Sequence, residues 1–448
     1  MKFRLSDNFK QTAIYFIGDI LVVATLSLFL LPFITNLLGV DVYGDFIYYK
    51  SVIEIITFSV IFGTSTAYSK FYVELSENEK EKYLFLIIIS YFFICLSLMI
   101  LITLFSDNYY YYAVVLCCFG TSLSSIIGLK FRLEFNPKKF IFYQITTAIL
   151  LIVFSLASPY LFDDNLIGLL IATGTGYLIF IITGLSYLIN PSVSQISLNE
   201  SFKIYKKIYC FGTPIFISYL SYFFYNKSSA FFLKHSNNFD DLAKLGISLQ
   251  LGLIIYLTMG AYGKFYQPLI LVKKLKAKII YTYDYLILLT GLTTILIFYG
   301  QDLLSLIIAK SFFSTPLENS LILISSYFIG LKLIFDSQLL LANKPSYSMF
   351  SSLIGGIIVL VSFIIFNEIT IMKVGVIMAI SSFLMLFFSI LLSNTSKFIY
   401  LDVLKMCFFL ISIIITFQIF NEIRQYGIIT ILLPIWYLLK RRNKLQHD

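Results

Sequence analysis

The sequence predicts an all-α polytopic membrane protein with 12–14 transmembrane helices: two halves of six helices and about two further helices at the C-terminus. Hydrophobic residues make up 59% of the 448 residues and charged residues only 13%, and the mean hydropathy is +0.88. A soluble domain carries about 25% charged residues. Apolar runs of about 20 residues, the length of a membrane-spanning helix, follow one another along the whole chain.

Fourteen apolar runs are the predicted membrane spans, separated by short polar segments. The first run follows a basic segment and is too long to be the core of a cleavable signal peptide, so we expect an uncleaved first helix. The last run is the shortest. In chain order the predicted spans are 14–38, 45–69, 83–105, 109–130, 140–160, 165–189, 208–233, 243–263, 281–300, 318–341, 347–367, 373–393, 399–420 and 426–440.

Basic residues lie mostly on one side of the predicted spans. Of the 33 Lys and Arg, 25 fall on the side of the membrane that holds the N-terminus and five on the opposite side. Because positive charge concentrates in cytoplasmic loops, both termini are expected to be cytoplasmic. The same asymmetry accounts for the net charge of +9, because the basic residues would face anionic lipids of the cytoplasmic leaflet. We therefore expect no nucleic-acid partner.

A six-residue motif occurs twice, 194 residues apart, as AYSKFY at 67–72 and AYGKFY at 261–266. Both copies lie at a predicted cytoplasmic helix end, six spans apart, as two parallel halves require. The predicted parts are an N-terminal six-helix lobe at 1–190, a C-terminal six-helix lobe at 191–395 that begins with a linker over 190–207, and a C-terminal helical hairpin with a basic cytoplasmic tail at 396–448.

Ionisable side chains inside predicted spans are the strongest candidates for a functional site. Each costs about 2.5–3.5 kcal/mol to insert at the centre of a membrane helix unless it is paired or faces water. Two pairs are spaced four residues apart and so share a helix face. They either neutralise each other or line a cavity whose lysines bind a diphosphate. The candidates are Asp19, Lys50, Glu54, Lys227, Lys332 and Asp336.

Two of these candidates have further alternatives. Lys50 lies near the outer end of its span and could instead sit at the membrane interface. Asp19 is either a counter-ion for Lys50 or a proton or sodium site.

The span 208–233 carries a polar stripe that includes Asn226 and Lys227. Pro214 removes a backbone hydrogen bond in the same helix and is the predicted hinge. The stripe is either a substrate-facing surface or a set of contacts between helices. The tyrosines of the chain can stack on sugars, although most are expected at the membrane interface or in helix packing.

Signals of enzyme activity are missing from the sequence. The chain has two histidines, His235 and His447, no Cys/His group with metal-ligand spacing and no phosphate-binding Gly-Lys-Ser/Thr loop. We therefore expect no catalytic residue, no metal and no cofactor. Transport would then be driven by an ion gradient, the membrane potential or consumption of the product, and not by ATP.

Several motifs resemble those of polysaccharide and O-antigen flippases, the Wzx-like members of the multidrug/oligosaccharidyl-lipid/polysaccharide (MOP) exporter superfamily. In the first half they surround the predicted second span, where the basic residue leaving the span is lysine although arginine is usual in the family. In the second half the segment 209–214 resembles the aromatic-x-Gly-x-Pro entry to the seventh helix of the family, with one more residue between Tyr209 and Gly212 than the pattern has. The residues are Leu38, Gly39, Tyr43, Gly44, 63–67, Lys70, Phe71, Tyr72, Phe211 (with Tyr209 before it), Gly212 and Pro214.

The resemblance implies two six-helix lobes around a central V-shaped cavity with alternating access. It implies transport of an undecaprenyl-diphosphate-linked oligosaccharide, an O-antigen or capsule repeat unit, across the bacterial inner membrane. The implied protein partners are the O-antigen polymerase and a chain-length regulator. The transporter itself is expected to be a monomer. Fourteen spans exceed the twelve-helix core of the family, which leaves the role of 396–448 open.

Two other functions fit a chain of this class. A MATE-like exporter of small molecules would need a mostly acidic central site, which the lysines disfavour. An O-antigen polymerase or membrane glycosyltransferase would need a large external loop or an acidic pair, and the predicted external loops are short.

Overall fold

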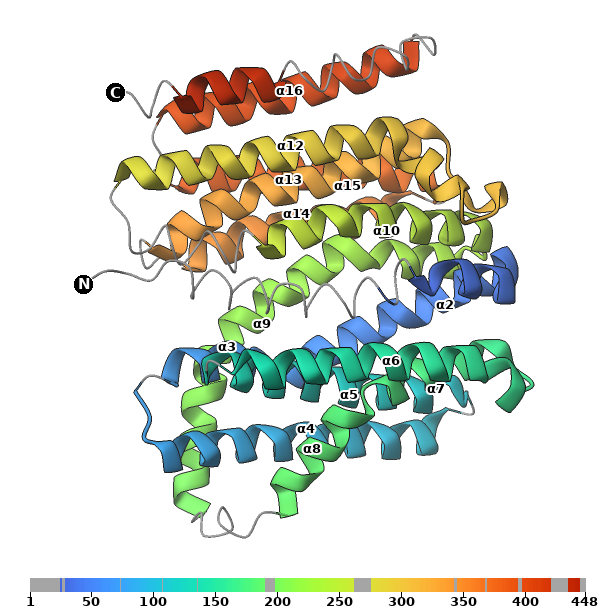
Figure 1. Cartoon of the computed structure of the whole chain (residues 1–448), viewed down its shortest axis with the longest axis vertical. Helices are drawn as coiled ribbons and strands as arrows, with labels where there is room; N and C mark the ends of the chain where they lie inside the picture. Colours follow the sequence, from blue (N-terminus) through green and yellow to red (C-terminus); the bar gives the residue numbers. More distant parts are fainter. Residues whose placement is uncertain are drawn as a thin grey trace. The chain divides into compact units, whose positions relative to one another are not determined.

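The computed structural model describes residue 25 and the ranges 29–72, 74–106, 108–134, 136–189, 198–261, 275–341, 345–366, 369–393, 397–419 and 434–443. All regular elements within these ranges are helices, as Figure 1 shows. The predicted all-α membrane class is therefore confirmed. Seven of the described helices are long and apolar enough to cross a membrane, or up to nine if each bent pair counts as one span.

The chain forms two compact units, Met1–Leu220 (unit 1) and Ser221–Asp448 (unit 2). The three-part division predicted at 190 and 395 stays a prediction.

Unit 1 is built around α5, which packs against α2, α4, α6, α7 and α8. Val114, Leu123 and Ile126 of α5 are completely buried. The helices of this unit are α2 (Leu31–Ile61), α3 (Thr64–Phe71), α4 (Glu77–Phe105), α5 (Tyr110–Leu133), α6 (Pro137–Leu161), α7 (Asn165–Gly176), α8 (Leu178–Ile189) and the first part of α9 (Leu198–His235).

Local sequence fixes several helix starts in unit 1. Ser76 and Glu79 form a capping box at the start of α4. The Asn136 side chain accepts a hydrogen bond from the backbone of Lys139, and Pro137 occupies the first turn of α6. Asp164 caps α7 by accepting from the first backbone N–H groups of that helix.

Two predicted spans are bent, which hydropathy alone does not reveal. The span predicted at 45–69 breaks at Phe62 and Gly63, both with positive φ (44° and 70°), so that α2 and α3 meet at 40°. The span predicted at 165–189 breaks at Tyr177 with a 52° bend between α7 and α8. The non-helical connection implied between the predicted spans 14–38 and 45–69 is also wrong in extent, because α2 is interrupted only at Gly39 and resumes directly after it.

The break between α2 and α3 touches α9 backbone to backbone. A Cβ atom on Gly212 would lie 2.5 Å from the Phe62 carbonyl oxygen, so only glycine fits there without a shift. Helix α9 begins at Leu198, within the predicted linker 190–207, and it includes Pro214. The linker is therefore shorter than expected, and the role of Pro214 as a hinge stays a prediction.

Unit 2 is built around α13, which packs against α10, α12, α14, α15 and α16. The apolar window of α13 is 78% buried, more than that of any other candidate span described. Besides the second part of α9, its elements are α10 (Phe239–Ala261), α12 (Leu275–Ser305), η4 (Lys310–Phe312), α13 (Pro316–Leu341), α14 (Pro345–Ile365), α15 (Ile371–Leu392), α16 (Lys397–Ile419) and a helical segment at 434–443.

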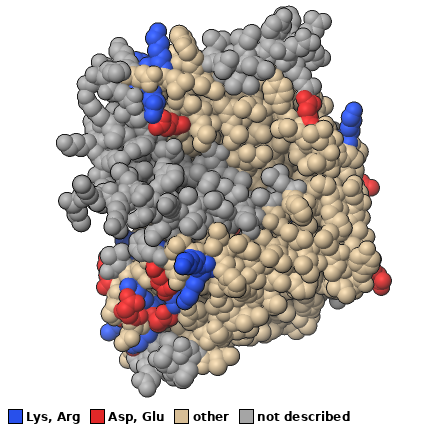
Figure 2. All heavy atoms as spheres, viewed as in Figure 1, with Lys and Arg blue, Asp and Glu red and all other residues tan. Residues whose placement is uncertain are grey.

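The outer faces of the unit 1 helices suit a lipid environment. Helices α4 and α6 expose large apolar side chains, such as Phe93, Leu104, Phe142 and Val153. In the part of Figure 2 that holds unit 1, charged atoms gather at the left, where α4 begins, and most of the described surface elsewhere is uncharged. Such a broad apolar surface is expected of a helix bundle that faces hydrocarbon.

Candidate functional site

The best-defined candidate site in unit 2 is centred on Lys332 of α13. Its side-chain amine lies 2.5 Å from a carboxylate oxygen of Asp336, one helical turn away, and donates to the Ser352 hydroxyl of α14 at 3.1 Å. Lys332 is 5% exposed. A charge buried to this extent needs a close partner, and the i, i+4 spacing places one on the same helix face.

Serines from two neighbouring helices complete this lysine–serine cluster, which consists of Lys332, Asp336, Ser351, Ser352 and Ser389. The Ser389 hydroxyl of α15 donates to the other Asp336 oxygen at 3.2 Å and lies 2.8 Å from the Ser351 hydroxyl. The cluster is neutral as a whole. It offers an ammonium group and several hydroxyls, the chemistry that binds phosphate oxygens.

A second polar surface of unit 2 lies on α9. Asn226 and Lys227 are half-buried, whereas Tyr225 and Ser229 of the same helix are completely buried. Among the described residues, Asn226 Oδ1 and the hydroxyls of Tyr225 and Ser229 have no hydrogen-bond partner. Buried polar atoms without partners cost about 1–3 kcal/mol each. Of these side chains only Asn226 and Lys227 are partly exposed, so they are the ones placed to contact a ligand.

In unit 1, Lys50 and Glu54 follow each other at one helical turn on α2, and both side chains are half-buried. Asp19 lies outside the described residues. The structure thus brings Lys332 and Asp336 into direct contact and places Asn226 and Lys227 next to each other on one helix. Substrate binding by any of the six predicted residues stays a prediction.

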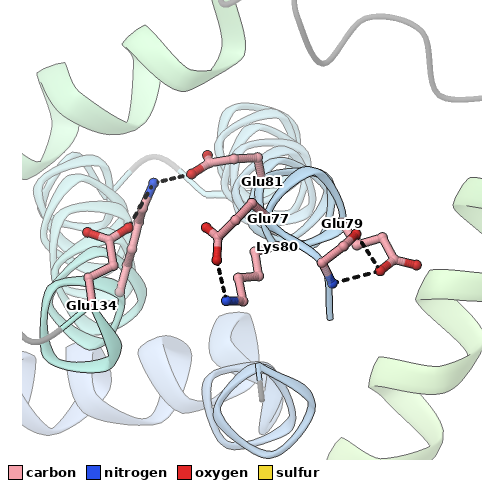
Figure 3. Close-up of polar contacts among 7 residues, drawn as sticks. Glu77, Glu79, Lys80, Glu81 and Glu134 are labelled. Atoms are coloured by element: carbon pink, nitrogen blue, oxygen red, sulfur yellow. Dashed lines mark hydrogen bonds and ion pairs between the residues drawn. The ribbon is translucent and has the colours of Figure 1, made fainter. Parts of the chain in front are cut away.

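Sequence reasoning missed a buried lysine in unit 1. Lys130, near the end of α5, is 7% exposed. Its amine lies 2.6 Å from Glu81 of α4 and 3.5 Å from Glu134, and it donates to the Tyr187 hydroxyl of α8 at 2.8 Å. Figure 3 shows Glu81 and Glu134 pointing toward the same amine. The sequence did contain a signal for the contact between Lys130 and Glu134, because the two residues are four positions apart and share a helix face.

Further ion pairs surround the start of α4. Lys80 contacts Glu77 at 2.6 Å, as Figure 3 shows, and lies over the Tyr72 ring. Lys82 reaches Glu200 of α9 at 2.7 Å. We call this region, with Lys130 and its partners, the charged end of unit 1. The contacts of Lys130 and Lys82 join α4 to α5 and to α9.

A buried carboxylate was also missed. Asp402 of α16 is completely buried and accepts from the hydroxyl of Tyr283 in α12 and from that of Tyr437. Arg441 lies 3.4 Å from it. Asp402 therefore joins α16, α12 and the helical segment 434–443.

Possible metal ligands and cysteines also occur among the described residues, where Cys210 is exposed and the other four cysteines are buried. No three His, Cys, Asp or Glu side chains among them are grouped closely enough to hold a metal ion. The adjacent Cys117 and Cys118 are buried and donate to the carbonyl oxygens of Leu170 and Ile53. This environment is that of structural cysteines.

Comparisons with known proteins concern the fold. No family model and no curated protein matches the sequence. The solved structure described as lipid II flippase MurJ in an inward closed conformation matches with a TM-score of 0.64 and 14% identity, over 98% of both chains. An inward-facing multidrug resistance MATE transporter of the MOP superfamily matches with a TM-score of 0.59 and 13% identity, over 85% of this chain and 93% of the other.

A third match is the eukaryotic MATE transporter AtDTX14, with a TM-score of 0.60 and 14% identity over 86% of this chain and 96% of that one. By description the first is a flippase and the other two are transporters. At these identities the likeness extends to the fold. This chain has the helical fold that is shared by a lipid II flippase and by MATE transporters.

Proposed function

We propose that this chain is a multi-pass transporter of the bacterial inner membrane that moves an undecaprenyl-diphosphate-linked oligosaccharide, an O-antigen or capsule repeat unit, to the outer leaflet by alternating access. The main support is the extent of the fold match. The flippase structure matches 98% of this chain, whereas the MATE structures match 85–86%. The difference is about the length of the C-terminal segment 396–448.

The lysine–serine cluster supplies the chemistry for the diphosphate. Asp336 neutralises Lys332, which keeps the buried charge tolerable. A phosphate oxygen entering the cluster would replace the carboxylate beside the lysine and accept from the hydroxyls of Ser352 and Ser389. Lys50 with Glu54 and Lys227 with Asn226 would supply further contacts to the diphosphate and sugar, while Asp19 would bind a coupling ion or pair with Lys50.

The test is a flipping assay in proteoliposomes. A fluorescent undecaprenyl-diphosphate oligosaccharide is placed in one leaflet, and a membrane-impermeant quencher reports its appearance in the other. We expect Lys332→Ala to slow flipping at least tenfold, since a charge-assisted hydrogen bond is worth about 1.5–3 kcal/mol. Lys310→Ala removes an exposed lysine of unit 2 and controls for the loss of one positive charge. The double variant Lys332→Ala with Asp336→Ala removes the buried pair as a unit and controls for the loss of stability. Equal rates for Lys332→Ala and Lys310→Ala would refute the role of Lys332.

A small-molecule exporter is the second candidate, supported by the MATE matches. The same proteoliposomes separate the two functions, because an exporter would transport cationic dyes and leave the lipid-linked sugar in place. A polymerase or glycosyltransferase would instead lengthen or transfer the sugar chain, which mass spectrometry of the recovered lipid would detect. Contact with the O-antigen polymerase and a chain-length regulator, by a monomeric transporter, is testable by crosslinking in native membranes.

A further inference from the structure

The end of unit 1 opposite the charged end carries a group of aromatic and polar side chains. Helix α4 runs from Glu77 to Phe105, and the chain enters α5 directly afterwards through residues 108–111. The positive-inside rule makes this the outer end. We call the group the outer tyrosine cluster. Its members are Tyr48 and Tyr49 of α2, Asn108, Tyr109, Tyr110 and Tyr111 at the start of α5, and Asp164, which caps α7.

The rings of the cluster form a continuous aromatic surface. Tyr109 and Tyr110 are stacked, with ring centroids 4.6 Å apart and an interplanar angle of 26°. Tyr110 in turn lies 5.1 Å from Tyr49, and Tyr49 lies 5.3 Å from Tyr48. Tyr109 is 50% exposed and Tyr49 only 6%, so the ring of Tyr109 is the part of the cluster that is most open to ligands.

A single carboxylate fixes the stacked pair. The hydroxyls of Tyr110 and Tyr109 donate to the same oxygen of Asp164, at 2.5 Å and 3.2 Å. The other Asp164 oxygen accepts from the backbone of Leu166 at 2.8 Å. Partial burial opposes ionisation of Asp164, but the bonds from Tyr110, from the backbone of α7 and from Tyr109 together lower its pKa. Asp164 is therefore a carboxylate at neutral pH.

Interfacial tyrosines that only anchor a protein turn their hydroxyls toward water and lipid headgroups. Here the hydroxyls of Tyr109 and Tyr110 turn toward Asp164, and the Asn108 amide donates to the Tyr49 hydroxyl at 3.1 Å. Exposed ring surface next to a fixed carboxylate and amide suits a saccharide, whose C–H face packs on a ring while its hydroxyls donate to the carboxylate.

We infer that the outer tyrosine cluster is a saccharide-binding site that holds the sugar part of the substrate at the outer side of the membrane. The long 3.2 Å bond from Tyr109 is the one that a sugar hydroxyl would replace on Asp164. Lys50 directly follows Tyr49 on α2. A sugar on the tyrosines would thus lie within about one helical turn of the level of a lysine proposed to bind the diphosphate. The inference rests on the proposed function for the identity of its ligand.

Saturation-transfer NMR on the full chain in nanodiscs tests the site. The probe is the free oligosaccharide released by mild acid from the undecaprenyl-diphosphate-linked repeat unit of the host. We expect Tyr109→Ala to weaken binding about tenfold, the effect of one lost aromatic contact. Tyr109→Phe, which keeps the ring, should bind as the wild type does. Tyr160→Ala is the matched control, because Tyr160 is 90% exposed at the end of α6 and lies outside the cluster.

Three results would overturn the inference: no saturation transfer to the wild type, equal affinity of Tyr109→Ala and the wild type, or equal losses in Tyr109→Ala and Tyr160→Ala. The last result would indicate general contact with the membrane interface. The flipping assay on the same wild-type protein distinguishes this failure from that of the proposed function. Flipping without saccharide binding would refute only the saccharide-binding site, whereas saccharide binding without flipping would refute only the proposed transport function.

Discussion

Replacing Gly212 by alanine should destabilise unit 1, although alanine is the better helix former. Alanine in place of a helical glycine gains about 0.5–1 kcal/mol. At this position the added Cβ would lie 2.5 Å from the Phe62 carbonyl oxygen, and that oxygen belongs to backbone that cannot rotate away. Forcing a methyl group into a closely packed contact costs about 1–3 kcal/mol. The net effect should be a loss of about 1 kcal/mol.

Gly128 of α5 provides a matched control of opposite sign. It is also a buried helical glycine, but the nearest atom to an added Cβ is a ring carbon of Phe140 at 3.5 Å, an ordinary contact. Gly128→Ala should therefore gain about 0.5–1 kcal/mol. Equilibrium unfolding of both variants in mixed detergent micelles gives the two free energies. If Gly212→Ala proves as stable as Gly128→Ala, the backbone contact between α9 and the α2–α3 break is not close in the folded protein.

Three further predictions concern charged side chains. Lys332→Ala should cost about 3–5 kcal/mol because it leaves Asp336 without its cation, and adding Asp336→Ala should recover much of this loss in a double-mutant cycle of unfolding free energies. Lys130→Met should lower the thermal midpoint of unfolding, since Glu81, Glu134 and Tyr187 lose one shared partner; an unchanged midpoint would mean that these contacts add nothing. The lowered pKa of Asp164 stabilises the folded state above its unfolded pKa of about 4, and this contribution is lost as pH falls through the folded pKa. In Asp164→Asn the thermal midpoint of unfolding should therefore fall less than in the wild type as the pH is lowered from 5 to 3 (roughly the range of unperturbed carboxyl groups).

The sequence was sufficient for the helical class and for most helix positions, because apolar runs of membrane length leave few alternatives. It was insufficient for the bends. Hydropathy depends on side-chain polarity and carries no information about the positive φ angles at Phe62 and Gly63. The early start of α9 was missed for a related reason. Residues 198–207 are mostly polar and basic, so the predicted span begins only at 208, after the helix itself has begun.

The candidate site was predictable only where it is local. The spacing of Lys332 and Asp336 indicated their shared helix face, whereas Ser352 and Ser389 enter the cluster through the packing of α13, α14 and α15. The contact of Lys130 with Glu81 spans 49 residues, and sequence spacing carries no information about it. Tertiary contacts of this kind depend on which helix faces meet, which one sequence does not specify.

The placement of Lys332 and Asp336 on one helix also matters during biosynthesis. Helix α13 emerges from the ribosome before α14 and α15, so Ser352 and Ser389 cannot yet contact it when this segment meets the translocon. Two separate charges would each oppose insertion by about 2.5–3.5 kcal/mol. A pair formed within the helix enters as a dipole, without help from later segments. The chain can thus deliver a buried lysine to the membrane interior before the helices that surround it have entered the membrane.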